Sequence, residues 1–183
     1  GLGTLAFSME DILLEPFGGE ILGLTVAQTT YLTAILAAGG LSGFAWASHV
    51  LSRGADPFRM ACRGAWVGIP AFAAVIISAP QASATLFSLG VFFIGYGAGL
   101  FGHGTLTATM NSAPSGEAGL ALGAWGAVQA STAGVAMALG GIVRDVAAQF
   151  VDSASAYSLV YSLEILLLVS TVLIMSPLVK VKP

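Results

Sequence analysis

The chain has 183 residues, of which 56% are hydrophobic and only 8% are charged, with a net charge of -3. Soluble domains carry about 25% charged residues, so this composition indicates a membrane protein. No basic tract suggests nucleic-acid binding, and the single cysteine, Cys62, excludes an internal disulfide.

The first 20 residues, GLGTLAFSMEDILLEPFGGE, contain an apolar stretch that ends at Glu10. This stretch is too short to cross a bilayer, which takes about 20 residues. It is either the end of a helix whose beginning is missing or a surface segment, and we expect residues 1–15 to be a truncated helix. Pro16 and the two glycines that follow Phe17 predict a turn at residues 16–20.

Five further apolar segments are each long enough to span a membrane. They cover residues 26–51, 60–78, 86–110, 119–146 and 157–179. Gly39 and Gly43 in the first of these five lie four residues apart, a spacing that lets two helix backbones approach closely. Pro70 predicts a kink in the next segment. The sequence thus predicts an all-α membrane protein, a single six-helix transmembrane domain whose first helix is cut short.

The basic residues predict the orientation of these helices. Five of them fall on one side of the membrane: Arg53, Arg59, Arg63, Lys180 and Lys182. Arg144 alone falls on the other side. Because cytoplasmic loops are enriched in Lys and Arg, we expect the carboxy terminus and the loop at residues 52–59 to be cytoplasmic.

The segment from Glu117 to Asp145 has no charge before Arg144 and is rich in glycine. Its small residues recur at steps of three and four, on one face of a helix: Gly119, Gly123, Gly126, Gly134 and Gly141. Such a face lets another helix pack closely in lipid. We therefore expect this helix to pack inside a bundle, with its small-residue face covered by other helices.

Two long segments carry a resemblance to a known family. MEDILLEPFGGEILGLTVAQTT and LGAWGAVQASTAGVAMALGGIVRD resemble the PucC/LhaA group, the bacteriochlorophyll-delivery branch of the major facilitator superfamily. The turn SRGADPFR is also similar to that group, although it lacks the glycine–aspartate–arginine spacing of ordinary transporters. The resemblance implies that the chain is the carboxy-terminal six-helix half of a twelve-helix protein.

The resemblance implies an assembly factor for bacterial light-harvesting and reaction-centre complexes, which docks antenna helices and delivers bacteriochlorophyll. Its partners would be antenna polypeptides, the reaction centre, membrane lipid and the amino-terminal half of the same protein. Its place would be the cytoplasmic, or intracytoplasmic photosynthetic, membrane. The alternative is half of a secondary transporter for a small solute, with its site near the bilayer midplane. The inner helices offer few polar residues for such a site, chiefly His103, Asn111 and Gln129, which favours the assembly factor.

Two histidines could hold a pigment, because the magnesium of bacteriochlorophyll accepts an imidazole. His103 lies within a predicted span between two glycines, where a flat ring could approach the backbone, and His49 lies near the cytoplasmic end of another span. The alternative for each is a hydrogen bond to a neighbouring helix.

Acidic residues form a second set of candidates. Glu10, Asp11 and Glu15 lie at the non-cytoplasmic end of the first helix, where they could guide a proton, bind a partner or simply be solvated. Glu164 falls inside an apolar span, so we expect it to be neutral or, more specifically, to form a structural ion pair with Arg144. The sequence shows no serine–histidine–acid set, phosphate-binding loop or metal-ligand spacing, so it predicts no enzyme and no metal site.

Overall fold

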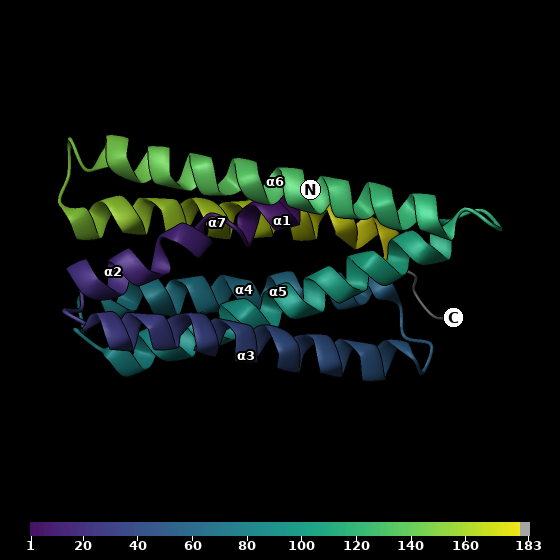
Figure 1. The fold of residues 1–183 in the computed structure, drawn as a ribbon, viewed down its shortest axis with the longest axis horizontal. Helices are drawn as coiled ribbons and strands as arrows, with labels where there is room; N and C mark the ends of the chain where they lie inside the picture. The colour runs from purple at the N-terminus through teal and green to yellow at the C-terminus, as the bar shows by residue number, and fades with distance from the viewer. Residues whose placement is uncertain (180–183) are drawn as a thin grey trace.

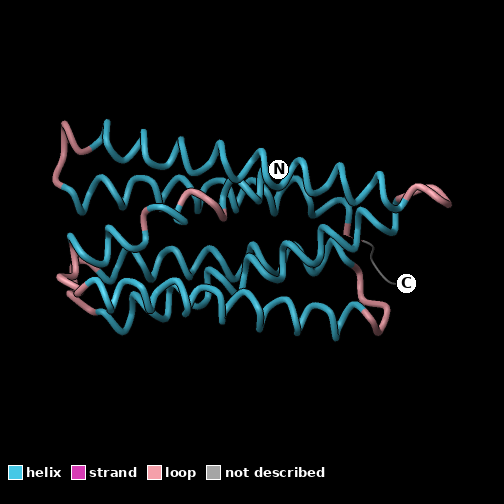
Figure 2. Tube along the Cα trace, in the orientation of Figure 1, coloured by secondary structure: helices cyan, strands magenta, loops and turns pink. Residues whose placement is uncertain are grey.

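A computed structural model describes residues 1–179, and this range is helical throughout apart from short connections (Figures 1 and 2). The five long helices are α3 (Val26–Leu51), α4 (Pro57–Ser78), α5 (Ala84–Ser112), α6 (Ala118–Ala147) and α7 (Ser153–Met175). All five are long and apolar enough to cross a membrane, so the chain is a multi-pass membrane protein. They confirm five of the six predicted spans. Lys180 and Lys182, which entered the prediction of orientation, lie outside the described residues.

The first 20 residues differ from the prediction. In place of one truncated helix over residues 1–15, the chain forms α1 (Leu2–Ala6), the 3-10 helix η1 (Glu10–Ile12) and α2 (Leu14–Glu20). The turn predicted at residues 16–20 is also wrong, because Pro16 lies in the first turn of α2, where no backbone N–H is needed. Gly18 serves close packing: an added Cβ would lie 3.1 Å from Leu32 and 3.3 Å from Phe87.

The helices form two groups, which Figure 1 shows one above the other. One group contains α3, α4 and α5, with α5 packed against both of the others; the second contains α6 and α7. The short helices α1 and α2 lie between the groups, and α4 also contacts α7. Aromatic rings fill the space between them, with Phe17 5.1 Å from Phe87 and 5.6 Å from Tyr161 between ring centroids.

Helix starts are marked by side chains that accept hydrogen bonds from the first free backbone N–H groups. Thr25 and Gln28 form a capping box at α3. Asp56 accepts from the Phe58 N–H at 2.9 Å, and Pro57 follows as the first residue of α4. Asp152 accepts from the Ser155 N–H at 3.0 Å, and its bonds to Ser155 hold the pKa of Asp152 below its ordinary value. These caps place the start of α4 and of α7 three or four residues earlier than hydropathy alone predicted.

The tightest packing in the described chain is between α3 and α5, and glycine makes it possible. A Cβ added at Gly39 or Gly43 would overlap the backbone carbonyl of Phe92 or Tyr96. On the opposing helix, a Cβ at Gly95 would overlap the carbonyl of Leu36. The close approach predicted for Gly39 and Gly43 is therefore confirmed, with α5 as the partner.

The small-residue face of α6, comprising Gly119, Gly123, Gly126 and Gly134, behaves differently. No atom of the described chain lies within 4 Å of a Cβ added at any of these four glycines. Only Gly141, the fifth predicted packing glycine, meets a neighbour, with Ile12 at 3.1 Å. Within the described chain α6 packs against α1, α5, α7 and η1 through its other sides, so this face stays open. Cover of the face by further helices, such as those of the other half of the protein, stays a prediction.

Candidate functional site

Two acidic side chains meet in the interior of the bundle. Glu164 lies at the midpoint of α7 and is 0% exposed, and Glu10 in η1 is 1% exposed. The two carboxyl groups are near enough to interact electrostatically. Within the described residues, neither oxygen of Glu164 nor Oε2 of Glu10 has a hydrogen-bond partner, and the hydroxyl of Tyr161 beside them is also unpartnered. Ionisable groups at this depth in a membrane protein are costly and usually functional.

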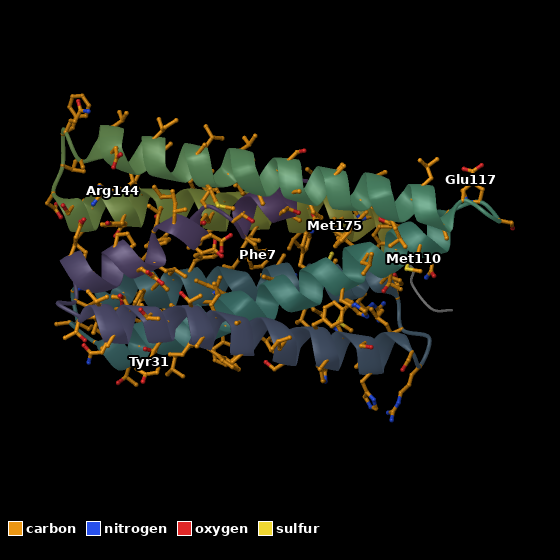
Figure 3. All side chains as sticks on the ribbon, viewed as in Figure 1. Phe7, Tyr31, Met110, Glu117, Arg144 and Met175 are labelled. Atoms are coloured by element: carbon orange, nitrogen blue, oxygen red, sulfur yellow. The ribbon has the colours of Figure 1, made fainter. Side chains whose placement is uncertain are left out.

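The predicted ion pair between Arg144 and Glu164 is wrong. Arg144 donates instead to Glu20 at 2.6 Å, to the Tyr157 hydroxyl at 2.8 Å and to Asp145 at 2.9 Å. Its guanidinium carbon also lies 4.6 Å from the centre of the Tyr157 ring. Arg144 is in the last turn of α6, at the end of the bundle opposite Met110 and Glu117 (Figure 3). Glu164 lies about 16 Å along α7 from its first residue, beyond the reach of an arginine at that end.

Within residues 1–179, no basic side chain forms an ion pair with either carboxyl group of the pair. Two ionised carboxylates in an apolar interior would each lose hydration and would also repel one another. We therefore expect at least one of Glu10 and Glu164 to be neutral; a neutral Glu164, the first of the two states expected for it, stays a prediction. The pair joins the amino-terminal segment to α7 through residues 154 positions apart.

The other two acidic candidates are placed at the surface. Asp11 is exposed. Glu15 is also exposed and accepts a hydrogen bond from the Thr33 hydroxyl at 2.6 Å, which links α2 to α3. Of the three residues predicted to bind a proton or a partner, only Glu10 is buried.

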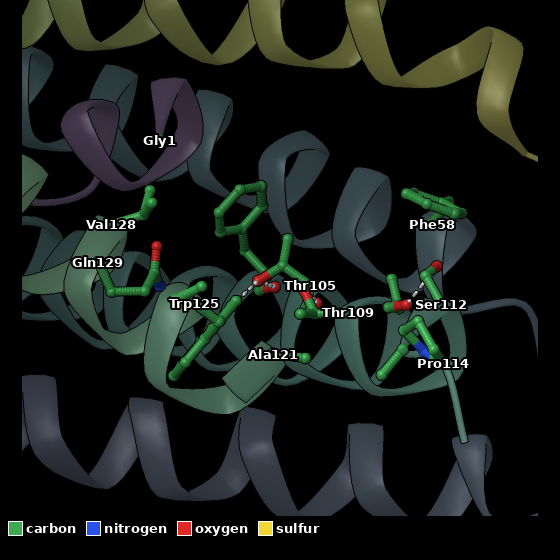
Figure 4. Close-up of a pocket in the computed structure, with 14 residues that line it drawn as sticks. Gly1, Phe58, Thr105, Thr109, Ser112, Pro114, Ala121, Trp125, Val128 and Gln129 are labelled. Atoms are coloured by element: carbon green, nitrogen blue, oxygen red, sulfur yellow. Dashed lines mark hydrogen bonds between the residues drawn. The ribbon is translucent and has the colours of Figure 1, made fainter. Parts of the chain in front are cut away.

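A groove of about 590 Å³ lies between α5 and α6 (Figure 4). Trp125 of α6 crosses it and donates to the Thr105 hydroxyl at 3.3 Å. Gln129 accepts a hydrogen bond from Thr4 of α1 and so helps to fix α6 to the amino-terminal segment. Thr109 and Ser112 donate to carbonyls of their own helix, each at 2.9 Å. The hydroxyls of α5 therefore present acceptors, not free donors, to the groove.

The structure separates the two histidines. The Nδ1 atom of His103 is buried and has no hydrogen-bond partner among residues 1–179, and the His103 ring meets the Phe44 ring edge-on at 4.2 Å between centroids. Nε2 is therefore the nitrogen through which His103 would hold a metal. His49, in the last turn of α3, is exposed. In the part of the chain that the structure describes, no group of three or more His, Cys, Asp or Glu residues could hold a metal ion.

Comparison with known proteins gives the family. The family model described as PUCC protein matches residues 1–182. The chain belongs to the PUCC protein family. It is 62% identical over 145 residues to protein PucC of Rhodovulum sulfidophilum, covering 79% of this chain and 32% of that protein. It is 50% identical over 185 residues to protein PucC of Cereibacter sphaeroides, covering 98% and 40%.

A more distant relative has a more informative name. The bacteriochlorophyll synthase 44.5 kDa chain of Rhodobacter capsulatus is 26% identical over 176 residues, covering 92% of this chain and 40% of that protein. The PUCC-family chain thus spans between 32% and 40% of the length of these three relatives. No solved structure matches it.

Sequence reasoning selected both acids of the buried pair in this PUCC-family chain, but it did not predict that they lie next to each other. Glu164 is a lone acid in an apolar span, whereas Glu10 ends an apolar stretch, which predicted a position facing solvent. The chain breaks between α1 and α2, and this break places Glu10 in the interior. The spacing of apolar residues in the sequence does not predict such a break. Glu20, one of the two acids paired with Arg144, lies in the stretch that was expected to be a turn, so sequence reasoning did not select it as a partner.

The Arg144 cluster gives a first prediction. Arg144→Gln should lower the thermal stability of the purified protein by about 1–2 kcal/mol, because three elements lose a shared charged donor that is partly exposed. Arg144→Lys should recover only part of this, since one ammonium cannot reproduce the planar fork of the guanidinium. The measurement is the melting temperature in detergent, with Arg53→Gln in the exposed 52–56 loop as control. Equal melting temperatures for Arg144→Gln and Arg53→Gln would contradict the role of the cluster.

Proposed function

We propose that the chain is the carboxy-terminal half of a major-facilitator-type assembly factor for bacterial light-harvesting and reaction-centre complexes. It works in the cytoplasmic or intracytoplasmic photosynthetic membrane, with its carboxy terminus in the cytoplasm. The observation that carries this proposal is the family match over residues 1–182, with relatives that include a protein named for bacteriochlorophyll synthesis. The family match itself supports a role in photosynthesis, and the role in assembly is our proposal.

The open face of α6 supports the docking part of the proposal. Its four glycines lie along one side of the helix, with no described atom near their Cβ positions. Exposed apolar side chains flank this face, including Leu120 and Val135 at 72% and 53% exposed. In lipid, close backbone approach over small residues is the main source of helix association. The face therefore suits a transmembrane helix, from an antenna polypeptide or from the amino-terminal half of the same protein.

Delivery of bacteriochlorophyll is the second part of the proposal. When bound, the pigment supplies a magnesium ion whose axial position accepts an imidazole. His49 suits this position because it is exposed at the end of α3, whereas His103 has only Nε2 to offer.

The alternative function is a secondary transporter, and the buried acids favour it to some extent. Glu10 and Glu164 lie at mid-depth, where proton-coupled carriers hold titratable groups. A solute site also needs several free polar groups, and the hydroxyls in the groove beside α6 already donate within their own helix. We therefore favour the assembly factor.

Purification from a phototrophic bacterium tests the proposal. We expect the protein to carry bacteriochlorophyll absorption in the near infrared, or to bring antenna polypeptides with it in mass spectrometry. A colourless protein without these subunits that takes up a solute when reconstituted would instead support the transporter.

A second prediction concerns the small-residue face of α6. The pair Gly119→Leu and Gly123→Leu should reduce antenna recovery at least tenfold, because two large side chains would hold a docked helix away from the backbone. The matched control is Ala127→Leu with Ser131→Leu, which has the same spacing but lies about 80° around the helix. The readout is antenna polypeptide recovered per protein, at equal levels of folded protein. Equal loss in both pairs, or in neither, would contradict docking on this face.

A further inference from the structure

A second groove, of about 680 Å³, runs along the outside of α4 and α5. Its walls are single stripes of the two helices. From α4 come Arg63, Trp66, Val67, Pro70, Ala71 and Ala74, and α5 contributes Leu86, Leu89, Gly90, Phe93, Tyr96 and Leu100. Because α4 and α5 are antiparallel neighbours, the groove follows the helix axes, and Trp46 of α3 also lines it. The groove is separate from the one between α5 and α6 and from the buried acids.

Arg63 makes one end of this groove positively charged. Among the described residues that line it, Arg63 alone is charged. Its side chain is exposed, and within residues 1–179 no ion pair or hydrogen bond engages it. It lies six residues after the start of α4, about 9 Å from the end of the bundle that carries the 52–56 loop. A cation at that depth below an interface can reach the headgroup layer while its stem lies on apolar surface.

The length of the groove suits one acyl chain. From Arg63 to Ala74 the α4 stripe rises about 16 Å, close to half of a hydrocarbon core about 30 Å thick. Large apolar side chains stand exposed along this length, including Trp66 at 60% and Leu89 at 52%. Because Arg63 already lies about 9 Å from the start of α4, the groove ends about 25 Å from that end of the helix, past the middle of the bilayer.

We propose that this groove binds an anionic phospholipid from the leaflet on the side of the 52–56 loop. The phosphate pairs with Arg63, and an acyl chain lies between α4 and α5 against Trp66, Phe93 and Leu89. Charge complementarity selects this occupant, because an esterified chlorin has an apolar body but no anionic group for Arg63. The predicted orientation makes this the cytoplasmic leaflet, whose surface is negative. The site stands apart from the proposed role in assembly.

Lipid titration of the purified, delipidated protein tests the inference. Native mass spectrometry would measure the apparent Kd for dioleoyl phosphatidylglycerol and for dioleoyl phosphatidylcholine. We expect the anionic lipid to bind more tightly, and Arg63→Gln to weaken it about fivefold, the contribution typical of one basic residue near a membrane surface. Arg53→Gln is the matched control, because it removes the same charge from the same end of the molecule but lies outside the groove.

A second variant tests the apolar part of the site without touching its charge. Ala74→Phe places a ring in the deep end of the groove and should weaken phosphatidylglycerol binding while Arg63 is intact. Equal affinity for the two lipids, an unchanged Kd in Arg63→Gln, or an equal loss in Arg53→Gln would overturn the proposal. Tighter binding of a neutral, esterified chlorin that displaces phosphatidylglycerol and is weakened by Ala74→Phe would assign the groove to pigment and also overturn the proposal.

Discussion

Replacing Gly95 with alanine should destabilise the protein by about 3 kcal/mol or more, the upper end of what overpacking costs. The added methyl group would overlap the carbonyl oxygen of Leu36 and lie 3.0 Å from the backbone nitrogen of Gly40. Both neighbours are backbone atoms, so no side chain can rotate away and α3 and α5 would have to separate. The measurement is the melting temperature and the monodisperse fraction after heating in detergent.

The same helix provides the control. A Cβ added at Gly102 meets no atom within 4 Å. Gly102→Ala should therefore leave stability unchanged or raise it by about 0.5–1 kcal/mol, because alanine restricts the unfolded chain and favours the helix. If both variants melted at the wild-type temperature, the close approach of α3 and α5 would be refuted.

The glycines also show how far a sequence pattern reaches. Gly39 and Gly43 were predicted to pack closely and do so. Gly119 and Gly123 have the same spacing in an equally apolar helix, yet nothing in the described chain meets them. Small residues at this spacing predict that a helix face can accept a close neighbour, because the backbone is accessible there. It carries no information on which helix fills that place.

Hydropathy was sufficient for the five long helices, because a membrane span is set by length and apolar content. It was insufficient for residues 1–20, where short helices are held by tertiary contacts such as Phe17 against Tyr161. The partners of the charged residues in the candidate site are likewise set by tertiary contacts, which hydropathy does not predict. Arg144 was expected to find Glu164 because both lie on neighbouring helices, but their depths differ, and the nearer acids Glu20 and Asp145 bind it instead.

The buried pair has a structural consequence for the amino-terminal segment. Glu10 lies in η1, between α1 and α2, and reaches the midpoint of α7. A protonated carboxyl group can remain there, whereas loss of the last proton would place two carboxylates side by side in an apolar interior, with no basic side chain of residues 1–179 paired to them.

Replacing Glu164 provides the sharpest test of this charge state. Glu164→Gln should keep the melting temperature within about 1 kcal/mol of wild type, because an amide has the shape of a neutral carboxyl group. Glu164→Ala should cost about 2–5 kcal/mol, since it empties a fully buried position.

The contrast between these variants separates packing from charge. If Glu164 were an anion balanced by a bound cation, Gln would remove the charge and destabilise the protein about as much as Ala. Such a result would contradict a neutral Glu164. The double variant Arg144→Glu with Glu164→Arg should recover nothing relative to Glu164→Arg, because Arg144 contacts Glu20 and Asp145 at the end of the bundle and never meets residue 164. Recovery in that double variant would restore the ion pair that the depths of the two residues argue against.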